Sequence, residues 1–90
     1  MVMITQIHMN GAGNRHEHIA SVKWRNPDTE KTGTSTVAEM VDFIENQKGV
    51  AKVTDGHRTV DVGVVDAKPR YIRTHADGVW TDNLLALPRF

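Results

Sequence analysis

The stretch that decides the fold reads Thr36-Val-Ala-Glu-Met-Val-Asp-Phe-Ile-Glu-Asn-Gln-Lys-Gly49. Thr36 with Glu39 three residues later is a capping box, in which the hydroxyl accepts from the amide of residue 39 and the carboxylate reaches back to the amide of residue 36. An apolar stripe follows at helical spacing, at Val37, Met40, Val41 and Ile44. Lys48 in the last turn and a left-handed Gly49 after it predict the end of a helix of about twelve residues.

Two segments before this helix alternate with the period of a strand, residues 3–9 and residues 18–24. The alternation places Ile4 and Ile7 on opposite faces of the first strand, and Ile19 and Val22 on opposite faces of the second. Residues 25–33 then carry a proline and a glycine without any periodicity, which predicts an exposed connection to the helix.

After the helix, the pattern predicts three more strands and a short final one, at residues 50–54, 58–65, 71–76 and 79–80. Asp55-Gly56 and Asp77-Gly78 are signals for tight hairpin turns between them. Val60, Val62 and Val64 share one face of their strand, so that strand should be buried on one side only.

These elements predict an α+β fold with the order ββαβββ, in which one amphipathic helix packs on one face of an antiparallel sheet of about five strands. Ninety residues, 39% of them hydrophobic and 24% charged, suit a single domain spanning residues 1–90 with one modest core. A homodimer or higher oligomer is expected, because association would stabilise so small a core.

The charge and cysteine content exclude several classes of function. Eleven basic and eleven acidic residues cancel, so nucleic acid is not favoured as a partner and no anionic membrane surface is expected to attract the chain. With no cysteine there is no disulfide framework and no thiolate metal site. No apolar run approaches the roughly 20 residues that span a bilayer, and a cytoplasmic protein is expected.

The closing stretch of the chain carries a family resemblance. It reads Tyr71-Ile-Arg-Thr74, then Ala76-Asp-Gly78, then Trp80-Thr-Asp-Asn-Leu-Leu-Ala-Leu-Pro88, and Glu17-His-Ile19 and Val22-Lys-Trp24 agree near the start. From about Ile4 to Pro88 the chain resembles the domain-of-unknown-function family 3892, small proteins of bacteria and their phages. The resemblance implies a single compact domain and carries over no activity, cofactor or catalytic residue.

Positive charge and aromatic rings gather in the last quarter of the chain, at Arg70, Tyr71, Arg73, His75 and Trp80. Tyr71, Arg73 and His75 alternate along one strand, so they should share a face. Such a face offers charge for a phosphate and a ring for a base. The sequence therefore predicts a small non-enzymatic module that binds a nucleotide or another anionic ligand, which in a phage would fit a role in host defence. The alternative is a solvated strand face without a ligand.

Two other functions remain open. The first is a protein-interaction or structural subunit that binds through its apolar C-terminal tail, Leu84 to Leu87, or through a sheet edge. Against the tail version stands the reading that these leucines pack on the sheet behind a cap at Thr81 or Asp82. The second is a small hydrolase, which would need His18 and Asp82 within hydrogen-bond distance in a cleft; the sequence shows no nucleophile elbow and no triad order.

His16 and His18 are the candidate metal ligands, because residues two apart on a strand point the same way. A closed zinc site needs a third and a fourth ligand, and the spacing brings no other histidine to this pair. No metal and no cofactor are therefore expected.

Overall fold

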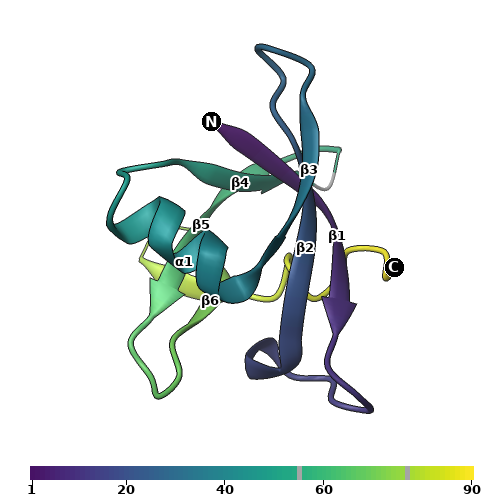
Figure 1. Cartoon of the computed structure of the whole chain (residues 1–90), viewed down its shortest axis with the longest axis vertical. Coiled ribbons are helices and arrows are strands. Elements are labelled where there is room, and N and C mark those ends of the chain that lie inside the picture. The colour runs from purple at the N-terminus through teal and green to yellow at the C-terminus, as the bar shows by residue number, and fades with distance from the viewer. Residues whose placement is uncertain (55, 77) are drawn as a thin grey trace.

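The computed structural model describes residues 1–54, 56–76 and 78–90. In this part of the chain the elements are β1 (Val2–Met9), the 3-10 turn η1 (His16–His18), β2 (Ile19–Arg25), β3 (Thr32–Thr36), α1 (Val37–Glu45), β4 (Ala51–Thr54), β5 (Thr59–Val65), β6 (Tyr71–Ala76) and β7 (Val79–Thr81). The described strands form one seven-stranded sheet in the order β3-β2-β1-β4-β5-β6-β7 (Figure 1). The α+β class is confirmed, whereas the predicted five strands are seven.

Helix α1 begins as predicted. The hydroxyl of Thr36 accepts a hydrogen bond from the amide of Glu39 at 3.1 Å, and the Glu39 carboxylate accepts one from the amide of Thr36 at 2.9 Å. Met40, at the centre of the apolar stripe, is buried. The helix contacts β2, β3, β5 and β6 and so covers one face of the sheet (Figure 1).

The end of α1 differs from the prediction. The helix stops at Glu45, and Lys48, with φ of 57°, takes the left-handed conformation that was expected of Gly49. Gly49 serves another purpose, because a Cβ atom there would lie 2.2 Å from Cζ of Phe43. The chain leaving the helix crosses the Phe43 ring too closely for any side chain.

Strand β3 is the element that the sequence did not reveal. Residues 32 and 33, predicted as part of an exposed connection, belong to a strand that pairs antiparallel with β2 over its full length. All five residues of β3 are threonine, serine or glycine, and none of them is buried. The strand therefore lacks the apolar alternation by which strands are recognised.

Shifts of register between β1 and β2 change the faces that these strands present. The pairing slips at two places, and a bulge of this kind inserts one residue and reverses the alternation beyond it. Ile4 and Ile7 are consequently both buried in the core, as are Ile19 and Val22. The prediction that each pair lies on opposite faces is wrong.

The sheet is mixed rather than purely antiparallel. β1 pairs antiparallel with β2 along one edge and parallel with β4 at Val2 and Met3 along the other. The C-terminal tail runs parallel to the later part of β1, where Ile7 bridges to Arg89. The pairs β4–β5 and β6–β7 are antiparallel as predicted, and the turn residues Asp55 and Asp77 lie outside the described residues.

The C-terminal leucines belong to the core. Leu84 is completely buried, and Leu85 and Leu87 pack against the buried cluster. The cluster joins residues of every described strand except β3 and β7 to Met40 of α1. The reading that the leucines pack on the sheet is therefore confirmed.

Truncating Leu84 should be costly. Leu84→Ala is expected to lower the free energy of unfolding by about 2–5 kcal/mol, because it removes buried methyl groups and leaves a cavity. Urea unfolding followed by circular dichroism measures the loss. Leu85→Ala, at a half-buried position, is the matched control and should cost less. Small and equal losses for both variants would show that the tail is not part of the core.

Candidate functional site

Strand β6 carries most of the predicted site. Ile72 and Thr74 are completely buried, so alternation places Tyr71, Arg73 and His75 on the opposite face of the strand. These three side chains are half-buried. The structure therefore brings them to one face, as the sequence predicted.

Strand β7 adds Trp80 directly opposite His75. The two rings lie edge to face, with centroids 5.4 Å apart and planes at 78°. On the other side of β6, a Cβ atom at Gly63 of β5 would lie 3.0 Å from Cδ2 of His75 and 3.4 Å from Cη2 of Trp80. A Cβ atom at Gly63 would therefore crowd the His75 ring and touch the Trp80 ring. We call the rings of His75 and Trp80 over Gly63 the Trp80 platform; its indole is 44% exposed.

Arg73 pairs across the sheet with Gly63 and is held at the strand end. Its Nε donates to the carbonyl of Thr81 at 3.1 Å, and its Nη2 donates to Oδ1 of Asp82 at 2.8 Å. Within the described part of the chain, no hydrogen bond or ion pair involves Nη1. Because Asp82 is 76% exposed, this ion pair is screened by solvent and contributes only about 0–1 kcal/mol.

Arg70 is not part of the same group. Its guanidinium forms ion pairs with Glu45 at the end of α1 and with Asp66 in the connection before β6. Two carboxylates therefore neutralise it beside the helix. Of the five predicted residues, the structure brings His75 and Trp80 into contact, places Arg73 and Tyr71 on the same face of β6 as His75, and sets Arg70 apart.

Two further charged residues border the platform and were missed in the sequence. Lys52 of β4 donates to Oδ1 of Asp61 at 2.8 Å, and Asp61 of β5 pairs across the sheet with His75. This hydrogen bond, together with the charges of Lys52 and His75, lowers the pKa of Asp61. The alternation that buries Val60 and Val62 already placed Asp61 and Gly63 on the opposite face, and that was the available signal.

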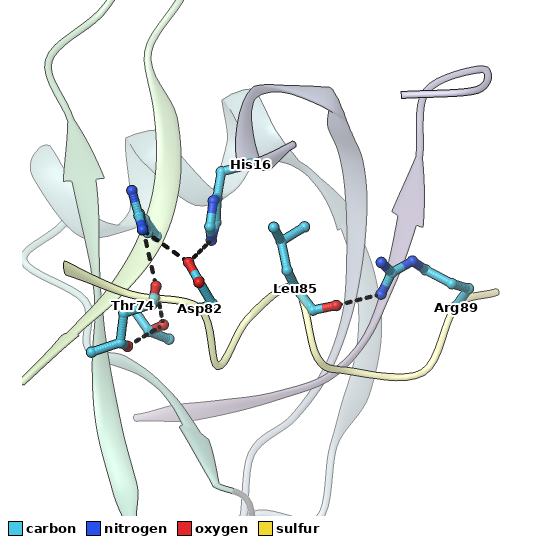
Figure 2. Close-up of polar contacts among 7 residues, drawn as sticks. His16, Thr74, Asp82, Leu85 and Arg89 are labelled. Carbon is cyan, nitrogen blue, oxygen red and sulfur yellow. Dashed lines mark hydrogen bonds and ion pairs between the residues drawn. The ribbon is translucent and has the colours of Figure 1, made fainter. Parts of the chain in front are cut away.

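His16 approaches the same carboxylate oxygen of Asp82 that pairs with Arg73 (Figure 2). The histidine is only 7% exposed, its Nε2 is 3.8 Å from Oδ1 of Asp82, and among the described residues this nitrogen has no hydrogen-bond partner. Burial lowers the pKa of His16 below its usual value of 6.5; the charge of Arg73 acts in the same direction, while Asp82 and Glu17 act against it. His16 is therefore a buried neutral base at pH 7.

His18 faces different groups. Its Nδ1 accepts from the amide of Arg15 at 3.2 Å, and its ring covers Gly13, where a Cβ atom would lie 2.2 Å from Cγ. Residues 16–18 form a 3-10 turn, so the prediction that this pair points the same way from a strand is wrong. In residues 1–54, 56–76 and 78–90 no group of three or more His, Cys, Asp or Glu side chains could hold a metal ion. Asp82 lies near His16 rather than His18, beyond hydrogen-bond distance.

Residues 3–88 match the model of a family described as a protein of unknown function, DUF3892. The chain belongs to this family. The DUF3892 match covers the stretch from which the resemblance was inferred, and the inference is confirmed. No curated protein and no solved structure matches the chain. Among the described residues of this DUF3892 chain, no helix has the length and apolar character needed to cross a membrane.

The stability of this DUF3892 chain should depend on pH through His16. Since its pKa is lowered on folding, the unfolded chain binds the proton more tightly, and the free energy of unfolding should fall as the pH drops from about 7 through 6.5 toward the folded pKa. Urea unfolding at about pH 7, 6 and 5 measures the slope. His16→Gln removes the titrating group and should give a shallower slope. Equal slopes for the two proteins would contradict the assignment of a neutral buried His16.

Proposed function

We propose that this DUF3892 chain is a small non-enzymatic binding module for a nucleotide or a similar anionic molecule with a planar ring. The site is the Trp80 platform together with Arg73. The observation that carries the proposal is a solvent-exposed indole that packs edge to face with His75, on the strand face that also carries Arg73, whose guanidinium keeps one nitrogen free of hydrogen bonds within the described residues.

The two parts of the site match the two parts of such a ligand. A base stacked on an aromatic side chain gains about 1–3 kcal/mol, and every base has a face to stack. A phosphate needs a positively charged donor, and Arg73 offers a planar fork whose Nε is already anchored on the carbonyl of Thr81. The competing carboxylate of Asp82 is exposed, so a phosphate could displace it at little cost.

Binding fits this site better than hydrolysis. The carboxylate of Asp82 is taken up by Arg73, and the nearest histidine nitrogen, Nε2 of His16, is buried 3.8 Å away from it. A general base must reach the proton that it removes, directly or through one water. We place the module in the cytoplasm, which the complete lack of cysteine supports.

A panel of nucleotides tests the proposal by thermal shift and by titration calorimetry on the full chain. Arg73→Ala should weaken the binding of the best nucleotide about tenfold or more, the usual effect of a lost hydrogen bond to a charged group. Arg70→Ala is the matched control, because that arginine pairs with Glu45 and Asp66, and it should bind like the parent. Absence of any nucleotide binding, or equal losses for both variants, would contradict the proposal.

Gly63→Ala tests the geometry of the same site without removing any ligand contact. The added Cβ atom would press on the His75 ring, which packs edge to face with Trp80, so nucleotide affinity should fall. The fold should be retained, because alanine in a strand lacks the entropic cost of glycine, about 0.5–1 kcal/mol. Urea unfolding of this variant verifies that a loss of affinity does not come from loss of the fold.

One observation favours a second function, pairing with another copy through the edge of the sheet. Strand β7 ends the strand order, and its Val79 is 63% exposed beside the exposed Trp80. An edge strand with apolar side chains offers unpaired backbone groups and a dry contact at once. The tail version of the interaction finds no such support, because Leu84 is buried and the tail lies along β1.

Light scattering after size exclusion tests the edge contact. If β7 joins two copies, Val79→Lys should convert the dimer into a monomer, because a charged edge resists pairing. Val50→Lys, at an exposed valine before β4, is the control and should leave the dimer intact. A wild-type protein that is monomeric at all concentrations rules out this second function and leaves the nucleotide site untouched.

A further inference from the structure

A pocket lies on a part of the molecule that the Trp80 platform does not use. It has a volume of about 420 Å³ and opens between α1 and the β2–β3 hairpin. Sites for small molecules usually enclose about 300–1,000 Å³, with mostly apolar walls and a few polar groups. The pocket falls in this range, and its floor includes the buried Met40.

Two aromatic rings form its walls, and each is seated on a glycine. Trp24 of β2 covers Gly33, where a Cβ atom would lie 2.5 Å from Cζ2 of the indole. Phe43 of α1 covers Gly49, where a Cβ atom would lie 2.2 Å from Cζ of the ring. The indole is fixed further, since its Nε1 donates to Oγ of Ser35 at 3.0 Å. The pocket is thus bounded by two flat apolar surfaces whose orientations are set by backbone contacts.

Two charged side chains, Glu39 and Lys31, lie at the rim of the pocket. Glu39 contributes a carboxylate, but this group accepts from the amide of Thr36 and lies at the positive end of α1. Lys31, in the loop between β2 and β3, makes no ion pair with any residue in the described ranges. Lys31 is therefore the side chain at the mouth that offers an ammonium group without a carboxylate partner among the described residues, while the Glu39 carboxylate is held by the amide of Thr36.

We infer that this pocket is a second binding site, for a small flat aromatic molecule that carries one anionic group, an aryl carboxylate or sulfonate. Its rings lie against Trp24 and Phe43, and its anionic group lies near Lys31. This site is independent of the proposed nucleotide site, since the two share no residue. Its ligand needs no phosphate, because Lys31 offers a single ammonium group, whereas Arg73 offers a guanidinium fork at the proposed nucleotide site.

The chain supplies a separate reporter for each site. It contains two tryptophans, and Trp24 lines the pocket while Trp80 forms the platform. Trp80→Phe leaves Trp24 as the sole indole, and Trp24→Phe leaves Trp80. Titrating the full-length Trp80→Phe protein with anilinonaphthalene sulfonate should quench Trp24 fluorescence saturably with a stoichiometry of one to one.

The charge is tested by a neutral analogue of the probe. In the Trp80→Phe background, Lys31→Gln should weaken the sulfonate probe about threefold, the value of an exposed charge pair, and should leave the affinity of uncharged phenylnaphthylamine unchanged. Lys68→Gln, at an exposed lysine before β6, is the matched control and should bind both probes like the parent. Urea unfolding of each variant verifies that it is folded.

The outcomes separate this site from the nucleotide site. No saturable quenching of Trp24, or equal effects of Lys31→Gln and Lys68→Gln, overturns the pocket. Quenching of Trp80 in the Trp24→Phe protein that equals the quenching of Trp24 in the Trp80→Phe protein also overturns it, because the probe would then bind at the Trp80 platform as well. Saturable quenching of Trp24 by the sulfonate probe, together with a nucleotide that quenches Trp80 but not Trp24, supports two separate sites.

Discussion

The backbone of Ile7 holds the two ends of the chain together. Its amide donates to the carbonyl of Pro88 at 3.0 Å, and its carbonyl accepts from the amide of Phe90 at 3.0 Å. The tail between β7 and this anchor must therefore cross the core, and Leu84 is buried on the way. Arg89 stiffens the same tail, since its Nη1 donates to the carbonyl of Leu85 at 2.7 Å (Figure 2). These hydrogen bonds between β1 and the tail also help to position Asp82, which begins the tail. Asp82 in turn accepts the hydrogen bond from Arg73.

Glycine residues lie directly beneath three of the aromatic side chains of this protein. Gly33 seats Trp24, Gly49 seats Phe43, and Gly63 lies under the Trp80 platform. A ring that lies against bare backbone loses rotational freedom and keeps its other surface available. With only 6% aromatic residues in the chain, these few rings make the principal flat surfaces that a ligand could contact.

Features of the fold that depend on residues close together in the chain were predictable from the sequence, and features that depend on distant residues were not. The capping box of α1 and the faces of β6 depend on neighbours within a few residues, and both were predictable. The bulges in β1 and β2 and the polar edge strand β3 are settled by pairing between strands, which periodicity within one strand does not record. The separation of Arg70 from Arg73 has the same origin, because Glu45, the partner of Arg70, is 25 residues away along the chain. Gly49 was read as a helix terminator because its contact with Phe43 is invisible without the packing of the turn.

Asp82 determines how the positive charge of Arg73 is balanced in this protein, which has no net charge. Oδ1 of Asp82 lies near two basic side chains, 2.8 Å from Nη2 of Arg73 and 3.8 Å from Nε2 of His16. Burial keeps the pKa of His16 low, so this histidine adds no charge near pH 7 and Asp82 balances Arg73 alone. The ion pair of Arg73 and Asp82 is exposed to solvent and is therefore weak. Breaking an ion pair in the core would instead leave a buried charge without a partner. In the proposed function, an anion would compete with one exposed carboxylate for Arg73, and the hydrogen bond from Nε to the carbonyl of Thr81 would still anchor the guanidinium.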